Sequence, residues 1–265
     1  MTRSLSLQTN YPTEYMVTEQ DALGYVQQCW IASLILLASY AWAVQGGLPI
    51  VGLILVVILV IPRWTISVHE LLHIYDPQQL NRVICLLGAS PVPLSVLTLG
   101  YREIQTLHFA HHRAAATETD PDAYHIRGAG WWVFLNAMTT PEQDAIRWIV
   151  AHGLSVSLAI ELLIKAALLG ALVWFGGITF LWFWLTLRFV YGVSDFIFFR
   201  CVHHQNGEYG SFALSVPSKL IRLGEWVFGE TVIHATLNHD LHHQCPGLAA
   251  RSLSSARQLQ PAESQ

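Results

Sequence analysis

Four long apolar runs most constrain what this 265-residue chain can fold into. Each run approaches the roughly 20 residues that an α-helix needs to cross the hydrocarbon core of a bilayer. We expect spanning helices at about residues 25–44, 48–68, 154–175 and 178–199. Only 12% of the residues are charged, about half the roughly 25% that is usual in a soluble globular domain. The sequence therefore predicts an all-α integral membrane protein.

Glycine-containing breaks separate the runs in pairs. Gln45-Gly46-Gly47 ends the first run, and Gly176-Gly177 ends the third. Connections this short leave room only for a turn, so we expect two antiparallel hairpins. Between them, the apolar stretch 83–98 contains Gly88, Pro91 and Pro93 and is expected as an interfacial or re-entrant segment.

The domain plan follows from these runs. Residues 1–24 are expected as a cytoplasmic lead-in, 25–250 as a single membrane domain, and 251–265 as a polar tail without apolar periodicity. Lys and Arg are absent from the turns after the first and third runs, so the positive-inside rule places both termini and the central segment in the cytoplasm. The net charge of −4 provides no basic surface for nucleic acid. The four cysteines form no CxxC pair and predict neither a disulfide framework nor a zinc knuckle.

Charged residues also occur inside the expected spans. Glu161 and Lys165 lie four apart in the third run, and Arg188 and Asp195 lie in the fourth. Charges at membrane depth are costly and usually face the interior of a bundle. We expect ion pairs or snorkelling near a helix end.

Histidines recur in three boxes at helical spacing. The first contains two histidines and the others three each: His69 and His73; His108, His111 and His112; and His239, His242 and His243. Residues three and four apart share one helix face, and neutral imidazole is a common metal ligand. An even number of spans precedes each box, so all three are expected on one side of the membrane, as a helical cap.

The adjacent His203 and His204 follow the fourth run, and either could supply a ninth imidazole. Nine ligands are too many for one tetrahedral ion, so the set predicts two metals. Imidazole binds zinc, copper, iron and nickel alike, which leaves the metal open at this point. The isolated His125, His152 and His234 are expected to be structural or to lie at the surface.

The HxxxH, HxxHH and HxxHH series resembles the histidine boxes of the membrane fatty acid desaturase and hydroxylase superfamily, which includes carotenoid ketolases and hydroxylases. The second box continues into Thr119-Asp120-Pro121-Asp122, similar to the family's HH…DPD. Asn238 to Pro246 is similar to its N-x-H-x-x-HH-x-x-P, although Asn238 is directly next to His239. Arg200 to His204 resembles R-x-x-x-E-H but is one residue shorter, with His203 where Glu is usual. The likeness covers most of residues 25–250.

The resemblance implies a histidine-ligated di-iron (Fe²⁺) centre with O₂ as co-substrate. The implied ligands are His69, His73, His108, His111, His112, His204, His239, His242 and His243. Glu70 and Asp240 are expected to orient imidazoles rather than to bind metal. The sequence lacks a Gly-rich dinucleotide fingerprint, so electrons are expected from a separate donor of the ferredoxin or cytochrome b5 type.

The predicted function is O₂-dependent introduction of a double bond into a fatty acyl chain within the membrane, with a carotenoid ketolase or hydroxylase as the alternative. A remote alternative is a membrane zinc metalloprotease, because His69-Glu70-Leu71-Leu72-His73 is also HExxH with Glu70 as general base. That alternative leaves the other two boxes unexplained. Aromatic residues of the fourth run are expected either to line an apolar tunnel or to pack against lipid and neighbouring helices.

Overall fold

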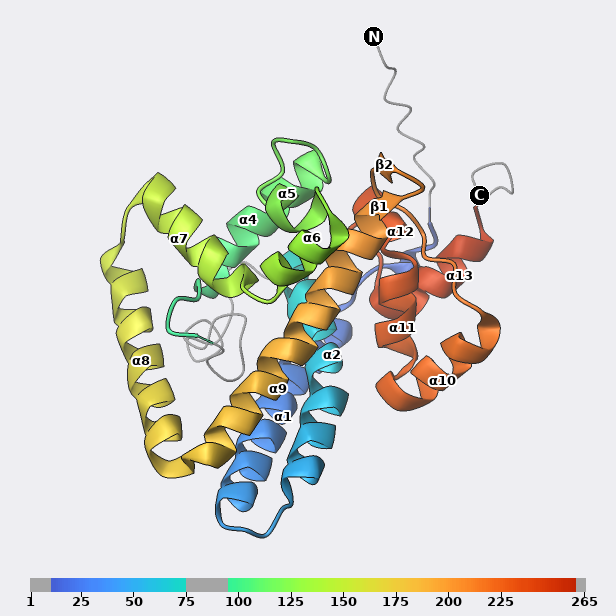
Figure 1. The fold of residues 1–265 in the computed structure, drawn as a ribbon. Helices are drawn as coiled ribbons and strands as arrows, with labels where there is room; N and C mark the ends of the chain where they lie inside the picture. Colours follow the sequence, from blue (N-terminus) through green and yellow to red (C-terminus); the bar gives the residue numbers. More distant parts are fainter. Residues whose placement is uncertain (1–10, 75–94, 261–265) are drawn as a thin grey trace.

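The computed structural model describes residues 11–74 and 95–260. The chain is mostly helical, and four helices are long and apolar enough to cross a membrane, as predicted. They are α1 (Glu19–Val44), α2 (Ile50–Ile74), α8 (Val156–Gly176) and α9 (Ile178–Asp195), the last continued by η2 (Phe196–Cys201) (Figure 1). The expected interfacial stretch at 83–98 falls largely outside the described residues.

Two of these helices extend beyond the predicted runs. α1 begins at Glu19 rather than at about residue 25 because Thr18 and Asp21 form a capping box, in which each side chain accepts from the other's backbone N–H. α2 continues to Ile74, beyond the expected end at residue 68. The first histidine box therefore lies on the last turns of a spanning helix.

Three of the four helices pack closely. α1 lies along α2, and α9 packs against α2, around a core that includes Leu36, Val57 and Phe183 (Figure 1). α8 meets α9 at the turn formed by Gly177, whose φ is +50°, and then diverges from it. Most of the α8 surface is exposed. The second pair of helices is thus an open V rather than a repeat of the first pair.

The charged residues inside the spans hold neighbouring segments in place. Lys165 of α8 is buried, and its Nζ donates to the carbonyl oxygens of Thr98 and Leu99, at 3.1 and 3.0 Å. Its expected partner Glu161 has one buried carboxylate oxygen without a hydrogen-bond partner among the described residues. Arg188 of α9 forms an ion pair with Glu142 at 2.7 Å. These contacts attach α8 and α9 to the chain around the second histidine box.

Short helices gather at the end of α2 and α9 that carries the histidine boxes (Figure 1). In the middle of the chain they are α4 (Tyr101–Ala114), α5 (Ala123–Ile126), α6 (Gly130–Ala137) and α7 (Thr140–His152). Nearer the termini they are η1 (Thr13–Tyr15), α10 (Ser218–Phe228), α11 (Glu230–Leu237), α12 (His239–Gln244), η3 (Ala250–Ser252) and α13 (Leu253–Gln258).

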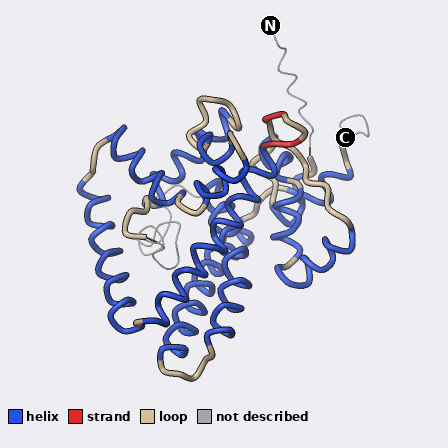
Figure 2. Tube along the Cα trace, in the orientation of Figure 1, coloured by secondary structure: helices blue, strands red, loops and turns tan. Residues whose placement is uncertain are grey.

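A small hairpin follows η2. Strands β1 (His204–Gln205) and β2 (Glu208–Tyr209) pair antiparallel, with His204 opposite Tyr209 (Figure 2). Asn206 and Gly207 connect them with φ values of +52° and +85°. Positive φ at both positions fits a two-residue turn and explains the Asn-Gly sequence.

Residues 251–258, expected as part of a polar tail, are folded. Leu253 and Ala256 are three apart and buried in the same core as Tyr25 and Leu241. Arg251 forms an ion pair with Asp21 at 2.8 Å. The element is short, so its two apolar positions were too few to reveal a helical period in the sequence.

Candidate metal centre

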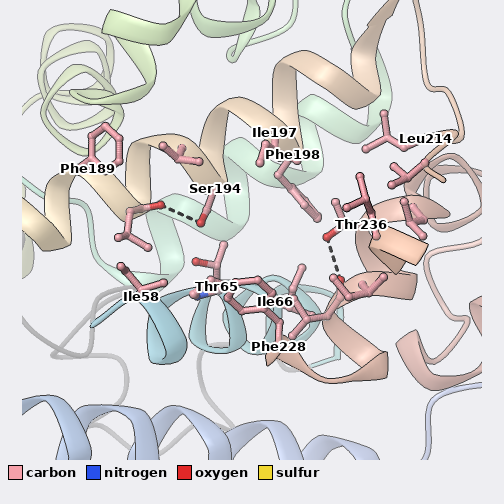
Figure 3. A pocket seen from close by; sticks show the side chains of 18 of the residues that line it. Ile58, Thr65, Ile66, Phe189, Ser194, Ile197, Phe198, Leu214, Phe228 and Thr236 are labelled. Atoms are coloured by element: carbon pink, nitrogen blue, oxygen red, sulfur yellow. Dashed lines mark hydrogen bonds between the residues drawn. The ribbon is translucent and has the colours of Figure 1, made fainter. Parts of the chain in front are cut away.

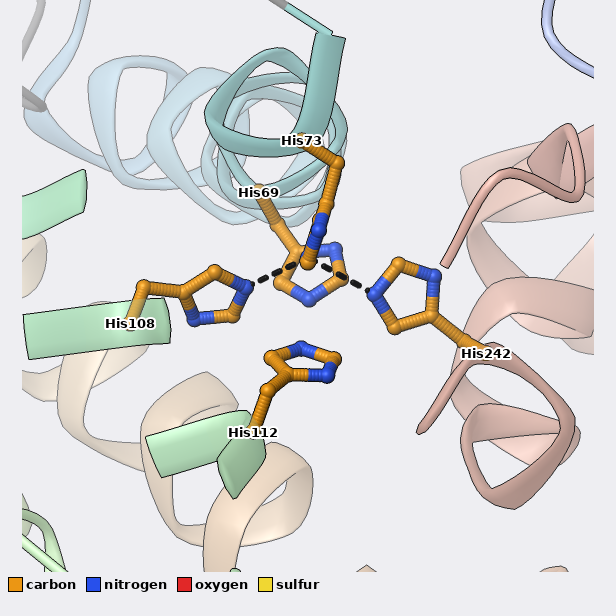
Figure 4. Close-up of side chains that lie close together, drawn as sticks. All are labelled: His69, His73, His108, His112 and His242. Atoms are coloured by element: carbon orange, nitrogen blue, oxygen red, sulfur yellow. Dashed lines mark hydrogen bonds between the residues drawn. The ribbon is translucent and has the colours of Figure 1, made fainter. Parts of the chain in front are cut away.

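Five imidazoles converge between α2, α4 and α12. The ligand nitrogens of this first cluster lie within 4.8 Å of one another and belong to His69, His73, His108, His112 and His242. His73 Nε2 lies 2.6 Å from His108 Nε2 and 2.9 Å from His242 Nε2 (Figure 4). All three histidine boxes contribute, so residues far apart in the sequence share one centre.

A second cluster adjoins the first. It contains His111, His203, His239 and His243, again with ligand atoms within 4.8 Å of one another. His112 of the first cluster stacks on His243 of the second, with ring centroids 4.1 Å apart. The i, i+3 and i, i+4 spacings on α4 and α12 thus serve two neighbouring centres rather than one.

His203, not His204, belongs to the second cluster, which corrects the predicted ninth position. The His203 ring is fully buried and lies 4.9 Å from that of His111, whereas His204 begins β1 and its ring contacts Tyr209 at 4.7 Å. Adjacent residues project in different directions in both helices and strands, so one of the pair must face away.

The π-helical turn η2, which is wider than a turn of α-helix, lies just before His203 and His204 in the chain. Its Phe198 packs against the rings of His69 and His239, with centroids 4.8 and 4.2 Å away. Phe199 contacts His111 on the other side, at 5.3 Å. A π turn inserted in an α-helix shifts the angular position of every residue that follows, and such turns are common at functional sites.

Three imidazoles have one anchored nitrogen and one free nitrogen. The anchored atom is Nδ1, which lies 3.2 Å from the Glu70 carboxylate in His69, 2.9 Å from Asp120 in His111 and 2.8 Å from the Gly210 carbonyl in His203. The opposite nitrogen, Nε2, is buried in each and has no hydrogen-bond partner among the described residues. An outer acceptor that fixes the ring while the inner nitrogen is left free is the usual arrangement around a metal-binding histidine.

The environment keeps the imidazoles neutral. Burial, together with the neighbouring histidines, holds the pKa of His108, His239 and His242 well below the ordinary value, and lowers that of His203 to about 3. Neutral imidazole is the form that binds metal. Buried, unpaired nitrogens on a set of neutral imidazoles fit borderline metals such as iron, zinc and copper, and not magnesium or calcium, which require oxygen ligands.

Carboxylates lie beside both clusters, and two of them, Asp120 and Asp122, form with His111 a third group whose ligand atoms lie within 4.8 Å of one another. Asp120 accepts the backbone N–H groups of Ala116 and Asp122 as well as lying against His111, so it braces the loop after the second box. Asp240, expected to orient a histidine, forms an ion pair with Arg257 instead. Glu70 does lie beside an imidazole, that of His69, as expected.

His125, predicted to be an isolated structural residue, belongs to a buried polar network. Its Nδ1 lies 2.7 Å from Asp195, and its Nε2 lies 3.4 Å from Asp122. Burial alone would lower the pKa of His125, but these two carboxylates raise it well above the ordinary value. The i, i+3 spacing of Asp122 and His125 was the available sequence signal, whereas the contact with Asp195 joins positions far apart in the chain.

A small cavity, the site cavity, borders both the histidines and this network. Its volume is about 130 Å³. His69 and His108 line it, together with Asp144, Thr140 and Asp195 and several apolar side chains. Burial raises the pKa of Asp144 to about 7. The cavity therefore has a candidate metal centre and a group of carboxylates on its walls.

A larger apolar groove lies next to it, between α2, α9, α10 and α11 (Figure 3). It has a volume of about 710 Å³. Thr65 and Phe198 line both the groove and the site cavity. The two spaces thus share two wall residues, and one of these, Phe198, also packs against His69 of the first cluster.

Comparisons of this chain with protein-family models, with curated proteins and with solved structures give no match. The geometry of the histidine clusters and of the adjoining spaces therefore carries the functional argument.

Proposed function

We propose that this protein is a membrane-bound, non-haem di-iron oxidoreductase that oxidises the hydrocarbon chain of a lipid with O₂. Membership of the histidine-box desaturase and hydroxylase superfamily is part of the proposal. The observation that carries it is the meeting of two buried imidazole clusters beside an apolar groove. Nine nitrogen ligands from four segments are more than one ion needs, and the groove matches a substrate that resides in the membrane.

Each cluster would bind one of the two irons. His69, His73, His108, His112 and His242 would hold one iron, and His111, His203, His239 and His243 the other. When bound, the irons supply O₂ activation and oxidation of an unactivated C–H bond, with two electrons from a separate donor of the ferredoxin or cytochrome b5 type. The protein contributes ligands, alignment of the target carbon and exclusion of water.

Phe198 is central to the alignment. It lies between the groove and the site cavity and contacts the rings of His69 and His239. A chain that passes from the groove into the cavity at Thr65 and Phe198 comes alongside His69 and His108. The apolar walls favour a hydrocarbon segment there and keep bulk water out.

A fatty acyl chain is the first candidate substrate, and desaturation is the proposed outcome. A carotenoid, oxidised to a ketone or alcohol, is the second, because the apolar groove suits any long hydrocarbon body. The metalloprotease alternative is disfavoured. Glu70 lies at Nδ1 of His69, on the opposite side of the ring from the free Nε2, where it orients the imidazole but is badly placed to activate a metal-bound water.

The proposal includes a cytoplasmic location for the clusters. The turn between α1 and α2 and the turn between α8 and α9 contain no Lys or Arg, whereas the segments on the side of the histidine boxes contain most of them. The positive-inside rule then orients the chain with its boxes toward the cytoplasm, where soluble electron donors are available.

Metal analysis of the purified protein tests the proposal. We expect about two irons per chain, and a loss of iron in His242→Ala but not in His152→Ala, because His152 is exposed and lies outside both clusters. One zinc and no iron would refute the di-iron assignment.

Substrate choice is tested in a host supplied separately with fatty acids and with β-carotene. Altered acyl chains support desaturation, and an oxygenated carotenoid with unchanged acyl chains supports the second candidate. Products of neither kind, from an iron-loaded protein with a working electron donor, would contradict the proposed function.

A further inference from the structure

The apolar groove presents almost no hydrogen-bonding capacity to a ligand. Four of its side chains carry hydroxyl groups, and each hydroxyl donates to a carbonyl one turn earlier in its own helix: Thr65 to Ile61, Thr186 to Trp182, Ser194 to Val190 and Thr236 to Val232. Figure 3 shows the bonds of Ser194 and Thr236. Because these donors are already used, an acceptor group of a ligand would find no free hydroxyl proton in the groove, and only the four hydroxyl oxygens would be left to accept a bond. The groove therefore selects a hydrocarbon body.

The site cavity, unlike the groove, has charged acceptor groups on its wall. The Oδ1 atom of Asp144 accepts from the Tyr124 hydroxyl at 2.9 Å, and its Oδ2 makes no hydrogen bond within the described part of the chain. Asp195 likewise accepts from His125 and Thr140 through Oδ2 alone, although the residue is only 5% exposed. Both residues line the cavity. Two carboxylates thus each have an oxygen available as an acceptor.

From this contrast we infer that the site cavity recognises a hydroxyl group at the leading end of the lipid substrate, with Asp144 as a specificity-determining acceptor. The inference rests on the proposed function and names the chemical class of its substrate: a long apolar lipid whose buried end bears a hydrogen-bond donor. The hydrocarbon body occupies the groove, the hydroxyl reaches Asp144, and the carbons between them lie beside His69 and His108.

The carboxylates that line the site cavity narrow the class of substrate further. Asp144, Asp195 and Asp122 all line the cavity, and the cation facing them from α5 is His125, which already lies between Asp195 and Asp122. A free carboxylate that entered first would meet like charges in a buried setting, which is strongly unfavourable. A neutral hydroxyl donates one hydrogen bond and adds no charge, so it fits both the volume and the electrostatics.

The test measures binding rather than turnover. Purified, metal-loaded full-length protein in detergent is incubated with radiolabelled 1-octadecanol, and unlabelled 1-octadecanol, 1-methoxyoctadecane, octadecane and octadecanoate compete for it. The assay is run at about pH 8, above the Asp144 pKa of about 7, where the carboxyl is ionised and a hydrogen bond to it gives about tenfold or more in affinity. We expect the alcohol to bind roughly tenfold more tightly than the methyl ether, which has the oxygen but no donor, and octadecanoate to bind more weakly than the alcohol.

Asp144→Asn is the decisive variant. Its amide oxygen can keep the Tyr124 hydrogen bond, which turns an NH₂ donor toward the cavity in place of an acceptor. We expect the preference for alcohol over ether to fall from about tenfold to near one. Glu208→Gln is the matched control, because it makes the same carboxylate-to-amide change at an exposed position of β2 that lines neither the groove nor the site cavity, and it should keep the wild-type preference.

Equal affinity of the wild type for alcohol and ether would overturn the inference. An unchanged preference for alcohol over ether in Asp144→Asn would also overturn it, and so would tighter binding of octadecanoate than of 1-octadecanol. The wild-type comparison needs no variant, so a poorly folded Asp144→Asn leaves the test intact. Iron content and lipid oxidation are measured separately, so a failure of this inference is distinguishable from a failure of the proposed function.

Discussion

At the scale of single residues, His203 and His204 show how strongly backbone direction decides whether a side chain joins a buried cluster. His203 is buried with its Nδ1 held by the Gly210 carbonyl, whereas His204 occupies a strand and faces Tyr209. The two side chains are chemically identical, so only orientation can distinguish their roles.

Replacing each of these histidines by alanine tests that distinction. We expect His203→Ala to lower the bound metal from about two ions per chain toward one, because the second cluster loses one of four imidazoles. His204→Ala should retain the wild-type content. Elemental analysis of the purified proteins measures both, and the reverse pattern would assign the ninth imidazole to His204.

The raised pKa of Asp144 predicts how the stability of the protein depends on pH. Its pKa is raised to about 7 by burial, so between its ordinary value of 3.8 and about 7 the folded state binds a proton that the unfolded state does not. Stability contributed by the neutral carboxyl is therefore present at low pH and lost as pH rises through 7. Asp144→Asn has no such proton, so its melting temperature relative to wild type should increase from pH 5 to pH 7 and then level off. A difference that is constant with pH would contradict this.

The histidine positions were largely predictable from sequence. Eight of the nine clustered histidines follow from helical spacing alone, because i, i+3 and i+4 fix a shared face before any tertiary contact is known. Spacing did not divide them into two centres, since that depends on which faces of α2, α4 and α12 meet. The contacts of His125, Asp195 and Asp144 could not be predicted from the sequence, because they join separate helices.

At the scale of elements, the π turn η2 affects the angular position of the residues that follow it, His203 among them. Deleting Ile197 should convert this turn to a regular α-helix and rotate the residues after it by roughly 100°. We expect His203 to leave the second cluster, with loss of about one metal per chain, whereas Ile197→Ala, which keeps the length, should retain both. Full metal content in the deletion variant would show that the π turn does not determine this position.

The buried lysine of α8 makes a second prediction at this scale. Lys165→Met removes two charged hydrogen bonds to the Thr98 and Leu99 carbonyls, immediately before α4. We expect the free energy of unfolding to fall by roughly 2–4 kcal/mol, together with lower metal occupancy. Thermal unfolding measures the first effect and elemental analysis the second. Lys219→Met removes an exposed lysine and should change neither.

Helix existence was easier to predict than helix ends or partners. Hydropathy located four spanning helices because long apolar runs have few alternatives in a bilayer. It missed the start of α1, which a capping box determines, and the extension of α2 through His69 and His73. It also predicted two similar hairpins, whereas α8 diverges from α9, because hydropathy does not record which helices pack together.

At the scale of the whole molecule, orientation in the membrane is the open prediction. The distribution of Lys and Arg predicts that the 45–49 turn lies outside the cytoplasm and that the histidine clusters lie on the cytoplasmic side. Alkaline phosphatase inserted at the turn should be active in a bacterial host, and green fluorescent protein fused after residue 265 should fluoresce. An inactive phosphatase with a dark fluorescent fusion would indicate the opposite orientation.

The distribution of ligands along the chain also sets an order of events during biosynthesis. His69 and His73 belong to the second span, whereas His239, His242 and His243 come after the last one. A chain that is still being threaded into the bilayer therefore lacks one wall of both clusters. Under the proposed function, both clusters are complete only once all four helices are in place and α12 lies against α2 and α4, so we expect metal loading to be a late step of assembly.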